Sequence, residues 1–138
     1  MKRNLIAVLT LGLLLAAPAL AQTAAMKVDV PFDFIVNGKT LPAGEYRVDA
    51  MPTSSGTIAI RSTEQSAKIV ALTNSCESLE AADTSKLVFH RYGNQYFLAQ
   101  VWSLGNSEGR ELPRSRAERE IASNNQPAPQ LVAIAALQ

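Results

Sequence analysis

The chain has 138 residues with 13 basic and 12 acidic side chains, one histidine and one cysteine, and its formal net charge is +1. This balance excludes a protein that works on phosphate backbones, because nucleic-acid binding needs a surplus of basic residues. Cys76 has no second cysteine to pair with, so an internal disulfide is excluded. A zinc site built around one cysteine and one histidine is uncommon. We therefore expect no metal, no cofactor and no nucleic-acid partner.

The first 21 residues have the layout of a secretory signal peptide. Lys2 and Arg3 form a cationic start, an uncharged apolar run covers residues 5–17, and Ala19 and Ala21 are small residues at the positions that a cleavage site requires. The apolar run is shorter than the roughly 20 residues of a spanning helix. We predict cleavage after Ala21, a net charge of −1 once Lys2 and Arg3 are removed, and a periplasmic or extracellular location without a transmembrane segment.

Alternating apolar and polar residues in the first half of the mature chain are typical of strands with one face in a core. Such stretches are residues 28–36, 45–50 and 57–61, and a fourth strand at 67–73 carries an apolar run that predicts burial on both faces. Pro31 cannot donate to a strand ladder, so the first strand should lie at an edge or be broken there. Asn37-Gly38 and the segment 41–44 are predicted turns.

A two-residue Gly93-Asn94 turn predicts a hairpin of strands 86–92 and 95–103, in which Tyr92 opposes Gln95. We expect the hydrophobic core of the protein to be centred on this hairpin. One face of this hairpin should carry Leu87, Phe89, Tyr96, Leu98 and Trp102, and the other Val88, Phe97, Ala99 and Val101. Apolar residues on both faces predict that the hairpin is covered on each side. The preceding segment, residues 74–85, is predicted to be a loop.

Ser115 is placed to cap a short helix at about 115–122, and Glu118 to reach back to the cap. Ala117 and Ile121 should share its apolar side, while Glu118 and Glu120 pair with arginines four residues earlier on a solvated face. Residues 124–138 follow as a linker and an apolar segment, 131–137, that forms a last strand or a tail. The sequence thus predicts a mainly β protein, with one antiparallel β-sandwich or small β-barrel domain over residues 22–123.

Catalytic motifs are not evident in the sequence, so we expect a non-enzymatic binding or cell-envelope component. The candidate binding face, at one turn end of the sheet, consists of Arg47, His90, Arg91, Tyr92 and Tyr96. Two other hypotheses stay open. One is a hydrolase centred on His90, which requires a serine or aspartate beside the imidazole and a pocket. The other is a self-assembling structural protein that pairs through an edge strand.

Three segments together, residues 30–46, 89–98 and 109–120, resemble a family of small exported proteins of unknown function found in acidobacteria and similar soil bacteria. The resemblance covers the chain from about Lys27 to Ala122. It implies a signal peptide and a single β-rich domain. It brings no reaction, ligand or catalytic residue with it, so the partner stays unknown, with an envelope protein or a polysaccharide as the candidates.

Overall fold

The computed structural model describes residues 25–50, 56–64, 66–124 and 128–137. The predicted signal peptide lies outside the described residues. Within them, no helix is long and apolar enough to cross a membrane. The elements in chain order are β1 (Met26–Val30), β2 (Phe34–Val36), β3 (Lys39–Leu41), β4 (Gly44–Ala50), β5 (Thr57–Ser62), β6 (Lys68–Leu72), β7 (Asn74–Glu77), β8 (Lys86–Tyr92), β9 (Gln95–Trp102), β10 (Glu108–Glu111), α1 (Arg116–Ser123) and β11 (Gln130–Ala135).

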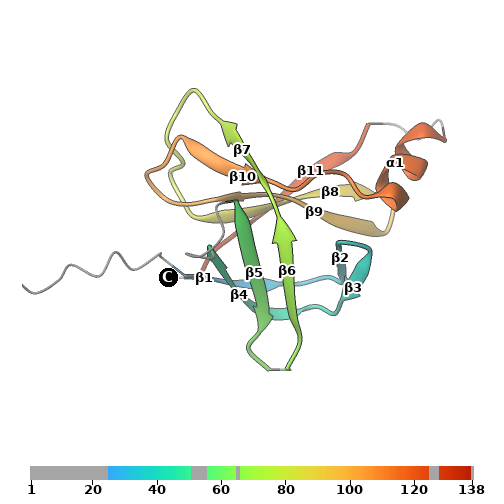
Figure 1. The fold of residues 1–138 in the computed structure, drawn as a ribbon, viewed down its shortest axis with the longest axis horizontal. Coiled ribbons are helices and arrows are strands. Elements are labelled where there is room, and N and C mark those ends of the chain that lie inside the picture. The colour runs from blue at the N-terminus through green and yellow to red at the C-terminus, as the bar shows by residue number, and fades with distance from the viewer. Residues whose placement is uncertain (1–24, 51–55, 65, 125–127, 138) are drawn as a thin grey trace, which may run out of the picture.

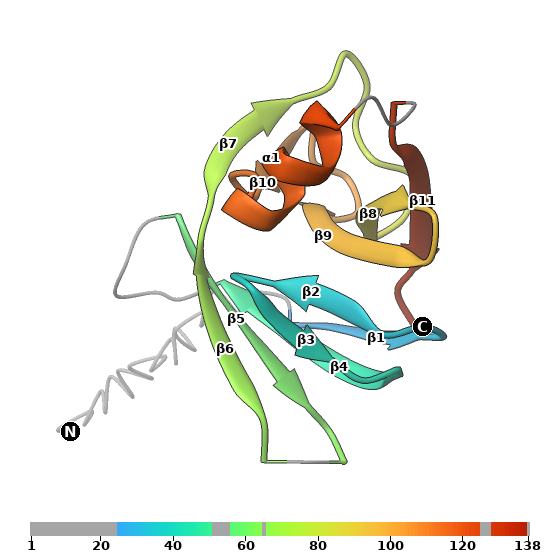
Figure 2. The same ribbon diagram turned by 90° about the vertical axis from the view of Figure 1, so that its right-hand side faces the viewer.

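The strands form two sheets that face each other (Figures 1 and 2). The first sheet has the order β1-β4-β5-β6, and we call it sheet A. The second, sheet B, has the order β11-β8-β9-β10-β7, with β2 joined to β9 and β3. Figure 2 shows the chain passing from sheet A into sheet B where β6 leads into β7. The predicted mainly β, sandwich-like architecture with one short helix near the C-terminus is confirmed.

The strand break and the turns of the first half of the chain lie at the positions predicted from the sequence. The first predicted strand is broken at Pro31 into β1 and β2, because a proline cannot continue the ladder. Asn37 and Gly38 both have positive φ angles, 51° and 76°, as the tight turn between β2 and β3 requires. Residues 42–43 connect β3 to β4 at the second predicted turn. Local backbone chemistry therefore determines the path of the chain up to β4.

Two predictions, one for β6 and one for β7, are wrong. Val70 and Leu72 of β6 are 45% and 72% exposed, although the apolar run predicted burial on both faces. The reason is position: β6 is the last strand of sheet A, and nothing among the described residues covers its outer face at these two side chains. Residues 74–77, predicted to be loop, form β7 instead, because β10 offers them an antiparallel partner. The exposure of β6 and the formation of β7 both depend on the order of strands in the sheets, which the local pattern of apolar and polar residues does not indicate.

The hairpin β8–β9 has the predicted register at its turn, with Tyr92 opposite Gln95 and Phe89 opposite Leu98. A bulge between Val88 and Phe89 then shifts the pairing by one residue. As a result Val101 belongs to the core between the sheets, and Trp102 turns to the other face, the reverse of the prediction.

On that outer face Trp102 packs against the strand backbone at Gly109. A Cβ atom at Gly109 would lie 2.7 Å from Cε3 of Trp102, so the close packing of the indole requires glycine.

Phe89 of the predicted hairpin belongs to the core between the sheets. Phe89 is fully buried, and its ring makes edge-to-face contacts with Phe32 and Phe34 at centroid distances of 5.0 and 5.4 Å. The ring of Phe34 in turn meets that of Tyr46 at 5.0 Å, which links sheet B to sheet A. The hydroxyl of Tyr46 donates to the carbonyl oxygen of Pro42 at 2.6 Å, so its polar end is satisfied. Aromatic packing thus joins the two layers.

Candidate functional site

The five residues of the predicted binding face do not form one surface. Arg47 lies on β4, in sheet A, with its exposed side chain held by Asp49 at 3.3 Å. The other four belong to the hairpin β8–β9 of sheet B. The structure therefore separates Arg47 from the rest.

Tyr96 is covered on both sides of its ring. Phe32 stacks on one face with a centroid distance of 3.7 Å and an interplanar angle of 14°. The guanidinium of Arg91 lies 5.5 Å from the ring centroid, on the face that Phe32 leaves free, and its Nε donates to the carbonyl oxygen of Gly93. Because both ring faces are occupied, Tyr96 offers no flat aromatic surface to a ligand. This stack stabilises the turn end of the hairpin.

His90 and Tyr92 meet a buried carboxylate on the helix. The Nδ1 atom of His90 lies 2.7 Å from Oε1 of Glu118, and the hydroxyl of Tyr92 donates to the same oxygen at 3.1 Å. Glu118 is only 4% exposed, and Arg114 approaches it at 4.0 Å. An ionised carboxylate only accepts hydrogen bonds, so the contact with His90 places a proton on Nδ1. Helix α1 is attached to sheet B through this cluster.

Helix α1 begins at the predicted residue, but the side chains that it buries differ from those predicted. Ser115 caps it by accepting the backbone N–H of Glu118 at 3.2 Å. The carboxylate of Glu118 does not complete a capping box, because it points to β8, and Ala117 is exposed instead of packing beside Ile121. The predicted solvated pair with Arg114 is thus one contact of a buried group. The other predicted pair, Arg116 with Glu120 at 3.1 Å, is solvated.

The group beside the imidazole is therefore Glu118, not the serine or aspartate that the hydrolase hypothesis requires. Glu118 orients the ring and joins the helix to the sheet, which is a structural task. His90, Tyr92 and Glu118 do not line the large cleft between the two sheets.

Burial makes the fold sensitive to alkaline pH through Tyr92 and Tyr46. Burial raises the pKa of Tyr92 above its ordinary value of 10.0, and the negative charge of Glu118 and its hydrogen bond raise it further. Burial likewise raises the pKa of Tyr46. Above about pH 10 the unfolded chain loses phenolic protons that the folded chain keeps. The contribution of these two tyrosines to the free energy of unfolding is therefore constant below that pH and falls above it. Urea unfolding between pH 8 and 11.5 is expected to show this fall. The Tyr92→Phe variant should show a shallower slope, and an identical slope would contradict the assignment.

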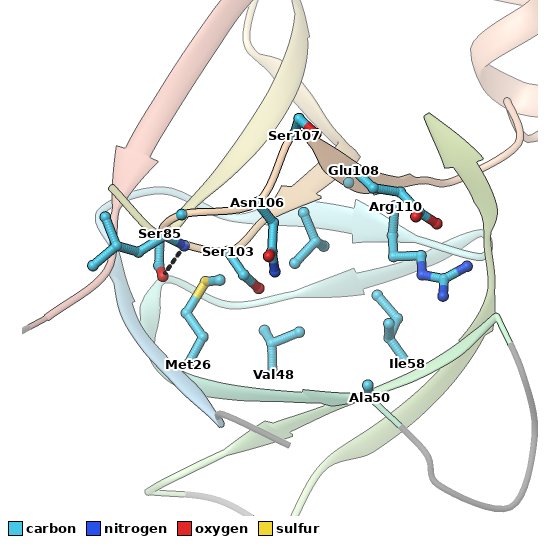
Figure 3. A pocket seen from close by; sticks show the side chains of 14 residues that line it. Met26, Val48, Ala50, Ile58, Ser85, Ser103, Asn106, Ser107, Glu108 and Arg110 are labelled. Atoms are coloured by element: carbon cyan, nitrogen blue, oxygen red, sulfur yellow. Dashed lines mark hydrogen bonds between the residues drawn. The ribbon is translucent and has the colours of Figure 1, made fainter. Parts of the chain in front are cut away.

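A cleft between the two sheets has the properties of a ligand site. It is half open to solvent and has a volume of about 1000 Å³, at the upper end of the range for small-molecule pockets. Figure 3 shows its side chains between the sheets. The lining residues come from both layers: Met26, Val48, Ala50, Ile58, Ser85, Val101, Ser103, Leu104, Gly105, Asn106, Ser107, Glu108, Gly109 and Arg110.

The floor and the roof of this cleft differ in chemistry. The floor is apolar and belongs to sheet A, with Met26 from β1, Val48 from β4 and Ile58 from β5. The roof is the β9–β10 loop, from which Ser103 and Asn106 point into the cleft (Figure 3). The loop is held by the backbone N–H of Leu104, which donates to the hydroxyl of Ser85 at 2.9 Å, and by other backbone bonds. The surface that the cleft exposes is about half apolar and half polar. Apolar surface beside convergent polar groups is a feature of ligand sites.

Arg110 is the cation of the cleft. It is half-buried on β10, and Figure 3 shows its side chain extending from the roof toward the floor at Ile58. Within the described parts of the chain, its guanidinium forms no ion pair and no hydrogen bond. Glu108, two residues earlier on the same strand, accepts the hydroxyl of Ser75 at 2.6 Å instead. No group in the described part of the chain therefore holds the guanidinium.

Sequence reasoning did not identify Arg110 as a site residue. It lies in the stretch 108–120, where four arginines and four glutamates balance each other, so the composition does not single it out. Helical i, i+4 pairing applies to Arg114 and Arg116, whereas Arg110 lies on a strand. The alternation of Glu108 and Arg110 about Gly109 was the available signal, because i and i+2 share one face of a strand. Which face lines the cleft depends on the packing of the sheets.

Comparison with models of protein families, with curated proteins and with solved structures found no match. The resemblance to exported acidobacterial proteins stays an expectation, and the functional argument depends on the geometry of the cleft.

Proposed function

We propose that the protein is an exported, non-enzymatic binding domain that holds a small, largely apolar molecule in the cleft between sheets A and B. The observation that carries this proposal is the combination of an apolar floor with a polar roof around about 1000 Å³ of space. Burial of apolar ligand surface contributes roughly 25 cal/mol per Å², so the floor at Met26, Val48 and Ile58 supplies the affinity. The hydroxyl and amide groups of the roof supply orientation.

Export of the protein from the cytoplasm is part of this proposal and is tested separately from ligand binding. A host that exports proteins to its periplasm is given the full chain with its own leader, and the protein is recovered from the periplasmic extract. N-terminal sequencing is expected to begin at Gln22, the residue after the predicted cleavage site. Recovery only from the cytoplasm, with Met1 or Lys2 first, would overturn the export part.

Binding is tested with the neutral fluorescent probe N-phenyl-1-naphthylamine. The probe should brighten in the presence of the mature protein, with a saturable dependence on concentration. Ala50→Trp places an indole at the floor of the cleft, where Ala50 is exposed to the open space. Because the added ring occupies the volume of the ligand, we expect the Kd for the probe to rise at least about tenfold, which is about 1.4 kcal/mol.

The matched control is Ala133→Trp, the same exchange at an exposed position of β11 outside the cleft. It should leave the Kd unchanged, and the circular dichroism of both variants should match that of the unaltered protein. Equal weakening by both variants, or none by Ala50→Trp, would show that the probe binds elsewhere and would refute the cleft as the site.

A further inference from the structure

We infer that the ligand of the cleft is an anionic amphiphile whose charged head group binds Arg110 and whose apolar tail lies along the floor of sheet A. This inference rests on the proposed function and adds the chemical class of the ligand. Its first support is that a half-buried guanidinium without a protein partner in the described chain extends toward the apolar floor of the cleft. A partly desolvated charge is costly unless it is paired, and an anionic ligand would pair it.

Glu108, the other charged side chain among the described residues that line the cleft, forms no ion pair with Arg110. Glu108 shares the face of β10, but its carboxylate accepts the hydroxyl of Ser75 and its side chain is exposed. Glu111 projects to the opposite face of the strand, because adjacent residues alternate. Cys76, whose pKa is raised chiefly by burial and then by Glu111, lies opposite Gly109 in the β7–β10 pair and shares its side of the sheet. The positive charge facing the floor is therefore that of Arg110.

The positions of the other lining groups give the ligand a direction. Figure 3 shows Arg110 above Ile58, with Val48 and then Met26 following along the floor away from it. A head group at Arg110 thus leaves the tail in contact with a continuous row of apolar side chains. Asn106 and Ser103, which point into the cleft between the two ends, are within the path of such a ligand and offer further donors.

The shared chemistry of the head group is an oxyanion. The planar guanidinium of arginine binds carboxylates and phosphates through two parallel N–H donors, whereas a neutral hydroxyl cannot form the charge-assisted pair. A fatty-acid carboxylate and an alkyl phosphate both satisfy this requirement. The experiment therefore includes both, next to ligands with the same tail and a different head.

Four ligands with twelve-carbon tails are compared by displacement of N-phenyl-1-naphthylamine from the mature protein, below their micelle-forming concentrations. Laurate and dodecyl phosphate should bind at least tenfold more tightly than dodecanol, and dodecyltrimethylammonium should bind no more tightly than dodecanol. Whichever of laurate and dodecyl phosphate binds more tightly identifies the head group. In Arg110→Gln the anion preference should fall to less than threefold, while dodecanol affinity stays unchanged.

The matched control is Arg61→Gln, which removes the same charge from an exposed position on the outer side of sheet A. It should keep the anion preference. Equal affinities for all four ligands, or a preference that survives Arg110→Gln, would overturn the inference. Because probe binding and its loss in Ala50→Trp do not depend on head-group charge, they would then still support the proposed function. If the probe itself does not bind, the proposed function fails first.

Discussion

Replacement of Glu118 by alanine is expected to lower the free energy of unfolding by about 2–4 kcal/mol. The substitution removes the one acceptor that the imidazole of His90 and the hydroxyl of Tyr92 share. A buried donor left without a partner costs about 1–3 kcal/mol, and two donors are affected. The loss would separate α1 from sheet B, because this cluster is the polar attachment between them. Urea denaturation followed by circular dichroism measures the change.

The same helix contains the matched control for this prediction. Glu120→Ala removes an equal charge two residues further on, where the side chain is 63% exposed and, among the described residues, pairs with Arg116. Solvent-exposed pairs contribute little, so its effect should stay within about 0.5 kcal/mol. Glu118→Gln keeps one acceptor oxygen and should fall between the two alanine variants. Equal stabilities of Glu118→Ala and Glu120→Ala would show that the buried contacts do not hold the helix.

Replacement of Phe89 by alanine is expected to cost about 3–5 kcal/mol, the usual range for a large aromatic residue removed from a core. Phe89 has no exposed surface, and its ring contacts Phe32 and Phe34 at the centre of the interface between the sheets. The cavity would be surrounded by strand residues whose backbone is held in the ladder, so it can collapse only in part. Since domains are stable by only 5–15 kcal/mol, the variant should be largely unfolded at moderate urea concentrations.

Phe89→Leu provides the comparison, because it keeps most of the apolar volume. Its loss of stability should be clearly smaller than that of the alanine variant, with the same dependence on urea concentration. A cost below about 1 kcal/mol for Phe89→Ala would contradict the position of Phe89 at the core centre, on which the sandwich arrangement depends.

Several features of the fold follow from local chemistry and were therefore predictable. Asn37-Gly38 and Gly93 take positive φ angles that few other residues tolerate, and these turns set the register of the adjoining strands. Pro31 breaks the first strand because it has no N–H to donate. Ser115 starts the helix by accepting a backbone N–H. Of the two alternatives for residues 131–137, a last strand or a tail, the strand forms as β11 (Gln130–Ala135), antiparallel to β8.

The candidate site was not predictable in the same way. The five residues proposed as a binding face include four that are neighbours in the hairpin, but their side chains are used for internal contacts with Glu118 and Phe32. The cleft is formed by side chains from strands and a loop far apart in the chain. Neither periodicity nor composition shows which side chains will meet across two layers.

The amino-acid sequence by itself determined the strand-rich class, the tight turns and the helix start, since each depends on interactions between residues a few positions apart. Tertiary structure alone decided three further matters: the bulge beside Val88 that exchanges the faces of Val101 and Trp102, the burial of Glu118, and the exposure of Leu72. It also decided that Arg110 faces the cleft. The physical reason is that burial depends on which surface a strand or helix packs against, and that surface is supplied by distant parts of the chain.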